Sequence, residues 1–166
     1  LSLTEAFVRP LYHWRTSRPH EYSHSPLNLP GEQAAFTGGP APGAQLSNVR
    51  LGDNRFLFDH LRAAFALLVF TEADLPADLQ TTVQKWRDQG VPLQVLAVSR
   101  TLSACDGADA CLPDPHGQFA QRYGIPAGGS LAAYLARPDQ HVCARWTTLD
   151  ATGLQAALQR ALPQTH

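Results

Sequence analysis

The chain has 166 residues, of which 44% are hydrophobic, and this is enough for one domain with a core of its own. Thirteen Lys and Arg against fourteen Asp and Glu leave a net charge of -1, so nothing electrostatic favours nucleic acid or an anionic membrane as a partner. No apolar run approaches the roughly 18 residues of a membrane-spanning helix, and three cysteines are too few for a secreted disulfide scaffold, so we expect a cytoplasmic protein.

Residues 1–44 are rich in proline and glycine and are predicted to form an irregular arm or linker. Their many apolar side chains argue against a free, solvated tail, so we expect the arm to lie on a neighbouring surface. The candidate interface residues are Trp14, Tyr22, Pro26 and Leu27. Because the chain contains no Met and opens on LSLTEAF, we interpret it as a piece of a longer polypeptide.

From Gln45 onward the pattern becomes α/β. The alternation in QLSNVRL (45–51) predicts a strand, and FLFDHLRAA (56–64) has apolar residues at helical spacing. The apolar runs 64–70 and 92–99 predict two strands buried on both faces, and the segment from Pro76 to Gly90 predicts a helix between them.

The second half of the chain continues this pattern. Residues 100–117 are predicted to form a loop, and QFAQRYG (118–124) a short helix. SLAAYLA (130–136) and HVCARW (141–146) predict a β-hairpin, and residues 150–162 an amphipathic helix. This order predicts that residues 45–166 form a mixed central sheet with helices on both faces, which is the thioredoxin-like arrangement.

Thioredoxin chemistry requires a thiolate at the helix entrance that follows the first central strand, where the helix dipole lowers the pKa of the thiol. Here that entrance is residues 71–76, which contain no cysteine and carry Glu72 and Asp74. The sequence therefore predicts that the thiol reaction has been lost, and we assign no catalytic residue.

The cysteines lie elsewhere. Cys105 and Cys111 share one loop and could form a disulfide, although two ordinary thiols are the alternative in a reducing compartment. Adding His116 does not complete a zinc site, because a fourth ligand is missing. The aspartates of the loop lack EF-hand spacing, so no metal is expected, and Cys143 is predicted to be a buried apolar residue.

Several short motifs resemble the C-terminal thioredoxin-like domain of FAD-dependent aromatic-ring hydroxylases, the phenol hydroxylase-like flavoprotein monooxygenases. In the C-terminal half they are Tyr123-Gly124, Gly128-Gly129, Arg137-Pro138-Asp139 and Ala144-Arg145-Trp146. In the N-terminal part they are the stretch Tyr22 to Leu27, Phe36 with Gly38-Gly39, and Pro42-Gly43-Ala44. The chain departs from the family pattern at Gln140, where Gly is usual, and at Gln45, where a basic residue is usual. The resemblance covers roughly residues 20–160.

The resemblance implies a non-catalytic domain with a structural or subunit-association role in an oxidoreductase. The chain lacks the G-x-G-x-x-G turn that cradles FAD, so FAD, NAD(P)H and the aromatic substrate would be handled by a preceding flavin domain. We therefore expect no cofactor in this chain, and we expect the flavin domain as its partner, with homo-oligomer formation also open. The main alternative is a free-standing, redox-inactive thioredoxin-fold binding protein, and a thiol-disulfide oxidoreductase that uses Cys105 and Cys111 is the weaker one.

Overall fold

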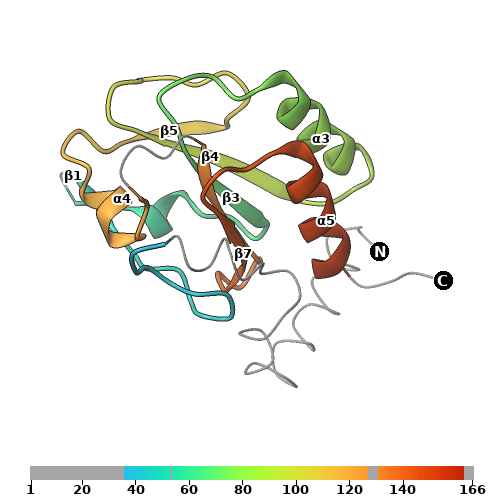
Figure 1. Ribbon diagram of the computed structural model, residues 1–166, viewed down its shortest axis with the longest axis horizontal. Coiled ribbons are helices and arrows are strands. Elements are labelled where there is room, and N and C mark those ends of the chain that lie inside the picture. The colour runs from blue at the N-terminus through green and yellow to red at the C-terminus, as the bar shows by residue number, and fades with distance from the viewer. Residues whose placement is uncertain (1–35, 53, 127–130, 163–166) are drawn as a thin grey trace.

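A five-stranded mixed sheet forms the centre of the fold, with the strand order β5-β4-β3-β6-β7 (Figure 1). The two central parallel strands are β3 (Phe65–Phe70) and β4 (Leu93–Ser99). β6 (Ala132–Ala136) runs antiparallel to β3, and β7 (Val142–Trp146) runs antiparallel to β6. β5 (Ala110–Pro113) runs parallel to β4 at the other edge. This topology confirms the predicted thioredoxin-like fold.

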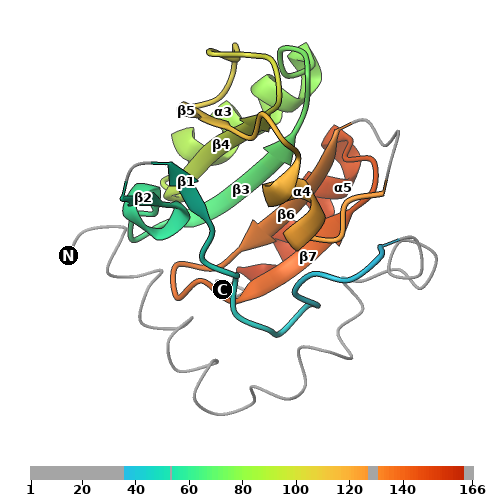
Figure 2. The ribbon, with the colours of Figure 1, turned by 90° about the vertical axis from the view of Figure 1, so that its left-hand side faces the viewer.

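The computed structural model describes residues 36–52, 54–126 and 131–162. Within them, α3 (Ala77–Asp88) and α5 (Ala151–Ala161) cover one face of the sheet, and α4 (Gln118–Arg122) lies on the other face (Figures 1 and 2). The 3-10 helix η2 (Leu57–His60) packs on the same side as α4.

Strand β3 is buried on both faces because alternate side chains enter two different cores. Phe65, Leu67 and Val69 pack with α3 and α5, whereas Leu68 and Phe70 pack with α4 and η2. All six residues of β3 are buried, and so are all seven of β4. The continuous apolar runs in the sequence therefore mark the two central strands, as predicted.

Two sequence predictions differ from the structure. Residues 45–51 form only a bridge from Gln45 to His141 and the start of a small hairpin, β1 (Arg50–Gly52) with β2 (Arg55–Phe56). Within residues 56–64 only the four residues of η2 are helical, and they form a 3-10 helix instead of the α-helix that the apolar spacing suggests. Leu57 is buried and Leu61 packs against the same core, so packing on one side accounts for these two apolar residues without an α-helix, whereas Phe56 is exposed.

Strand β5 lies inside residues 100–117, which the sequence predicts to be a loop. It has only four residues and ends in Pro113, which lacks a backbone N–H. The pairing with β4 continues past the proline through the amide of Asp114, which donates to the carbonyl oxygen of Ser99 (2.8 Å). A short edge strand that ends in proline is a poor template for further strand pairing.

The opposite edge of the sheet is covered by the chain just before the domain core. The amide of Gly43 donates to the carbonyl oxygen of Val142, and the amide of Val142 donates to that of Ala44, both at 2.8 Å. The amide of Leu46 donates to the carbonyl oxygen of Gln140 (2.8 Å). Residues 36–46 therefore form one irregular segment, named here the arm segment, which runs along β7.

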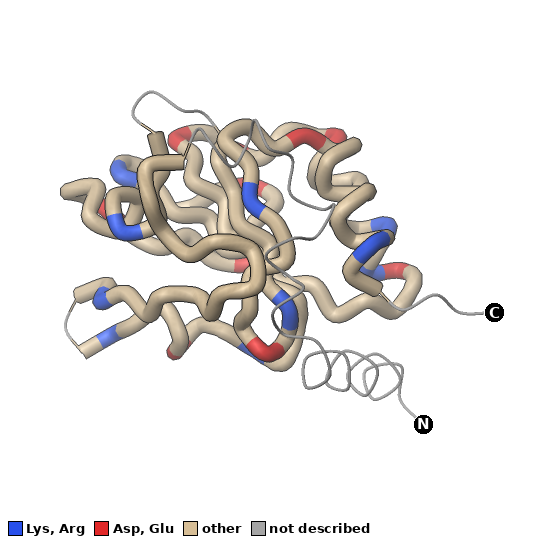
Figure 3. The backbone as a smooth tube through the Cα atoms, turned by 60° about the horizontal axis from the view of Figure 1, so that its bottom comes forward, with Lys and Arg blue, Asp and Glu red and all other residues tan. Residues whose placement is uncertain are grey.

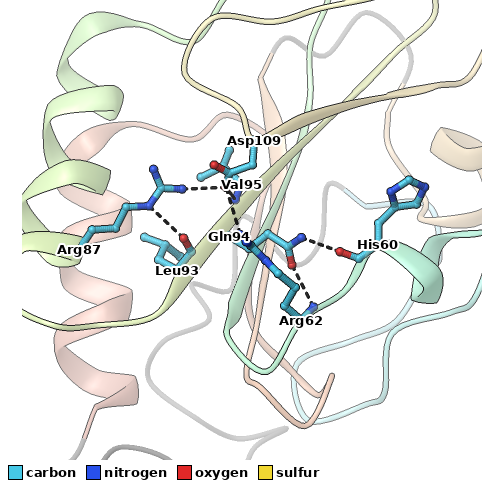
Figure 4. A network of polar contacts seen from close by, with 7 residues as sticks. All are labelled: His60, Arg62, Arg87, Leu93, Gln94, Val95 and Asp109. Carbon is cyan, nitrogen blue, oxygen red and sulfur yellow. Dashed lines mark hydrogen bonds and ion pairs between the residues drawn. The ribbon is translucent and has the colours of Figure 1, made fainter. Parts of the chain in front are cut away.

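A polar network ties the start of β4 to its neighbours (Figure 4). The side chain of Gln94 is buried, accepts a hydrogen bond from the amide of Arg62 (3.2 Å) and donates to the carbonyl oxygen of His60. The carboxylate of Asp109 accepts from the amide of Val95 and from Arg87, both at 2.7 Å. These contacts join η2, α3 and the residue before β5 to one strand.

Charged residues of both signs are interspersed along the described part of the chain (Figure 3). Among the described residues, none of the helices has the length and apolar character that a membrane crossing requires.

Candidate functional site

The junction between β3 and α3 is where a thioredoxin fold would hold its reactive thiol. The hydroxyl of Thr71 donates to the carbonyl oxygen of Ala73 (2.9 Å) and accepts from the amide of Ala73 (3.1 Å), which fixes the turn that leaves β3. The next residue, Glu72, turns its carboxylate towards the loop that follows β4. This position therefore carries an acid.

The carboxylate of Glu72 accepts hydrogen bonds from four donor groups, two backbone amides and two hydroxyls. It accepts hydrogen bonds from the backbone amides of Arg100 (2.9 Å) and Thr101 (3.0 Å) and from the hydroxyls of Ser99 and Thr101, both at 2.7 Å. Partial burial by itself would raise the pKa of Glu72, but these hydrogen bonds outweigh it and lower the pKa. The side chain is thus an ionised strut between the ends of β3 and β4.

Cys105 lies against the same junction, although it comes from the loop after β4. Its Sγ is 3.5 Å from the carbonyl oxygen of Ala73, and the residue is only 8% exposed. Burial raises the pKa of the Cys105 thiol, and the nearby charges of Asp74 and Asp106 raise it further. Sequence reasoning did not anticipate this placement, because nothing local in CDGADAC points to α3. The thiol is close to the helix entrance, but its environment disfavours the thiolate.

The other two cysteines are also free thiols in the structure. Cys111 donates to the carbonyl oxygen of Leu102 (3.4 Å), and burial raises its pKa. Cys143 is fully buried in the core between the sheet and α5, and burial raises its pKa to about 12. The buried, apolar role predicted for Cys143 is confirmed, and the disulfide between Cys105 and Cys111 stays a prediction.

A second site is formed where the arm segment meets the sheet, and its centre is Arg145. This arginine is 5% exposed, and its Nη1 donates to the carbonyl oxygens of Gly38 (2.9 Å) and Pro40 (3.2 Å). Its guanidinium also lies 4.3 Å from the ring centroid of Phe36 and donates to the hydroxyl of Tyr134 (3.2 Å). One buried cation thus holds a turn of the arm segment through two carbonyls and an aromatic ring.

Tyr134 links this cation to the end of α4. Its hydroxyl donates to the carbonyl oxygen of Tyr123, and the two rings meet edge to face with centroids 5.0 Å apart. Burial raises the pKa of Tyr134 in spite of the hydrogen bond from Arg145, so the phenol remains a neutral donor. The hydroxyl of Tyr123 in turn donates to the carbonyl oxygen of Ser47, beyond the arm segment.

Two glycines allow the backbones to approach closely at this site. Gly39 has φ +78°, and a Cβ there would overlap the carbonyl of Tyr123. Gly124 has φ +68°, and a Cβ there would overlap the backbone of Gly38. The amide of Thr37 donates to the carbonyl oxygen of Gly124 (3.0 Å) across the same contact. We name this set of contacts the arm clasp; its residues are Phe36, Gly38, Gly39, Pro40, Tyr123, Gly124, Tyr134 and Arg145.

The motif Arg137-Pro138-Asp139 forms the turn between β6 and β7. The buried Arg137 pairs with the carboxylate of Asp139 (2.8 Å), and the amide of Gln140 closes the turn by donating to the carbonyl oxygen of Arg137 (2.8 Å). Gln140 has φ +70°, the left-handed conformation that glycine adopts without strain. The chain therefore keeps the turn geometry of a glycine at this position.

The remaining predicted site residues fall into two groups. Trp14, Tyr22, Pro26 and Leu27 lie outside the described residues. In the described ranges 36–52, 54–126 and 131–162, no group of three or more His, Cys, Asp or Glu side chains is arranged to hold a metal ion. Neither observation adds a catalytic residue.

The described residues form a thioredoxin-like domain. The carboxylate of Glu72 lies at the entrance of α3, and the arm clasp, centred on Arg145, binds the arm segment. No family model matches the sequence, and no curated protein matches it.

Solved structures do match. The flavin-dependent monooxygenase PieE, in complex with FAD and substrate, is 24% identical over 74% of this chain and 20% of its own, with a TM-score of 0.54. Aklavinone-11 hydroxylase, in a ternary complex with FAD and aklavinone, is 27% identical over 75% of this chain and 22% of its own, with a TM-score of 0.53. RebC-10x, soaked with chromopyrrolic acid, is 20% identical over 74% and 19%, with a TM-score of 0.50.

The resemblance to FAD-dependent aromatic hydroxylases is thereby confirmed, and the chain is similar to one part of these proteins. It matches about a fifth of their length. Six of the residues that carry the resemblance in the sequence belong to the arm clasp: Phe36, Gly38, Gly39, Tyr123, Gly124 and Arg145.

Proposed function

We propose that this chain is the non-catalytic C-terminal domain of an FAD- and NAD(P)H-dependent aromatic-ring monooxygenase, and that its role is structural. The arm clasp is the observation that carries the proposal. A domain that functions as an appendage must be fixed to the residues that precede it, and here Phe36, Tyr123-Gly124 and Arg145, which belong to the distinctive motifs, contribute to that attachment. The flavin domain before the arm would be its partner.

The thiol sites support the same proposal. The helix entrance holds Glu72, and the three cysteines are buried or partly buried with raised pKa values. A thiol oxidoreductase needs the opposite environment, with an exposed and stabilised thiolate. Free thiols suit the reducing cytoplasm, which is the compartment we propose.

The first test is the reading frame that encodes the chain. An upstream G-x-G-x-x-G turn between a strand and a helix, as FAD binding requires, is expected. A native start within a few residues of Leu1 would refute the proposal and favour the free-standing binding protein.

The second test separates a structural role from a catalytic one in the longer polypeptide. The exchange Arg145→Met should lower the thermal midpoint while FAD content and turnover per bound flavin remain as in the wild type. Arg122→Met, at an exposed arginine on α4, is the matched control and should leave all three measurements unchanged. A loss of turnover per flavin with Arg145→Met, at unchanged FAD content, would contradict the structural role.

A further inference from the structure

A pocket of about 400 Å³ opens at the carboxyl ends of β3 and β4, on the face that carries α4. Phe70, Val98 and Ile125 form its apolar lining, and Thr37 of the arm segment contributes to its wall. In open α/β sheets this end of the parallel strands is where ligands bind, and the volume suits a small organic molecule.

The two carboxylates that line the pocket are already engaged by donors. Glu72 accepts hydrogen bonds from the amides and hydroxyls of the loop after β4, as described above. Asp114 accepts from the amides of Phe119 (2.9 Å) and Ala120 (3.0 Å) at the start of α4. Hydrogen bonds to both oxygens of each acid disperse the negative charge, and they leave these groups poorly placed to bind a cationic ligand.

Unlike these two carboxylates, the side chain of Arg100 is not engaged in hydrogen bonds with the described residues. Its guanidinium lies beside Gly117, where an added Cβ would be 3.6 Å from its Cζ. No hydrogen bond or ion pair joins this side chain to any residue in the described part of the chain. Gln121, on the next turn of α4, likewise lines the pocket, and its side chain carries an amide. The donors that the pocket can offer are therefore those of a guanidinium and a carboxamide.

We propose that this pocket binds a small carboxylate with an apolar body. Arg100 pairs with the carboxylate through its planar pair of N–H donors, Gln121 donates a further hydrogen bond, and the apolar body rests on Phe70, Val98 and Ile125. Guanidinium–carboxylate pairing of this kind is geometrically specific, so a neutral molecule of the same shape should bind less well.

The complete pocket requires the arm segment to be in place. Thr37 belongs to the arm segment and donates to the carbonyl oxygen of Gly124 beside the clasp, so one wall is in place only when the clasp is closed. By linkage, a ligand that binds the closed form also stabilises it. Ligand binding should therefore slow hydrogen exchange at the amide of Thr37.

Benzoate is the probe, and benzamide is its neutral counterpart of the same shape. Amide NMR shifts of the whole chain should move saturably with benzoate, and the changes should centre on Arg100, Gly117, Gln121 and Ile125. Benzamide cannot form the guanidinium–carboxylate pair, and because Arg100 is exposed the pair is partly screened by solvent, so benzamide should bind about fivefold more weakly.

Two variants test the role of the guanidinium. Arg100→Gln should weaken benzoate binding about fivefold, and Arg122→Gln, on α4 but outside the pocket lining, should leave it unchanged. Arg100 is exposed, and the dispersion of the amide spectrum checks that the variant is folded. Shifts that do not saturate, equal binding of benzamide, or equal binding by Arg100→Gln would each overturn the proposal.

Discussion

Replacing Arg145 tests whether the arm segment is an integral part of the domain. In Arg145→Met the side chain keeps an apolar stem of similar length, but it loses the hydrogen bonds to Gly38, Pro40 and the hydroxyl of Tyr134. It also loses the cation that lies over the ring of Phe36. The two carbonyl oxygens would then lack a buried charged donor.

The loss of stability expected for Arg145→Met can be estimated from these contacts. Hydrogen bonds to a charged group contribute about 1.5–3 kcal/mol each, and a cation–π contact about 0.5–2 kcal/mol. The contacts share one guanidinium, so they do not add in full, and water can reach the carbonyls if the arm segment detaches. We expect the free energy of unfolding to fall by about 3–4 kcal/mol, a large part of the roughly 5–15 kcal/mol typical of a domain.

Urea unfolding followed by tryptophan fluorescence measures the loss, with Arg122→Met as the exposed control. Hydrogen exchange then locates it: the amides of Thr37, Gly43 and Leu46, which bond to the domain, should lose more protection than the amides of β3. A loss below about 1 kcal/mol, or arm-segment amides that stay as protected as those of β3, would refute the clasp.

Three further outcomes can be measured. Gly39→Ala should cost at least about 2 kcal/mol more stability in urea than Gly52→Ala, because both positions have positive φ but only a Cβ at Gly39 meets neighbouring atoms; equal losses would contradict the close approach. Since hydrogen bonds lower the pKa of Glu72, the stability that they supply is present above glutamate's ordinary pKa of 4.5 and is lost as the pH falls through the folded value. The stability difference between wild type and Glu72→Gln should therefore shrink in acid, and a difference independent of pH would count against the ionised strut. Thiol alkylation at neutral pH, read by mass spectrometry, should label Cys111 before Cys143, which is fully buried and should react only on unfolding; early labelling of Cys143 would show that its site opens.

The residues of the arm clasp can be found as short motifs in the sequence, but the sequence does not show that they contact one another. Phe36, Tyr123 and Arg145 lie far apart along the chain, and each stands beside residues of no obvious chemistry. The strand β7 presents Arg145 to the arm segment, and Tyr123, the C-cap residue of α4, lies at the same place. Periodicity could place each residue on its element, but the contact between the elements comes from the sheet order.

The central strands and the empty thiol position were decided by local sequence. The apolar runs at 64–70 and 92–99 predict strands buried between two layers, and residues 71–76 contain no cysteine whatever the rest of the chain does. Neighbouring residues encode such features, so the sequence alone determined them.

Tertiary structure alone decided which distant groups meet. It brought Cys105 to the entrance of α3, paired the four residues of β5 with β4 in spite of Pro113, and placed Arg100 beside a pocket. Contacts of this kind depend on how strands are ordered and how loops close over them, and no periodicity of adjacent residues records that order.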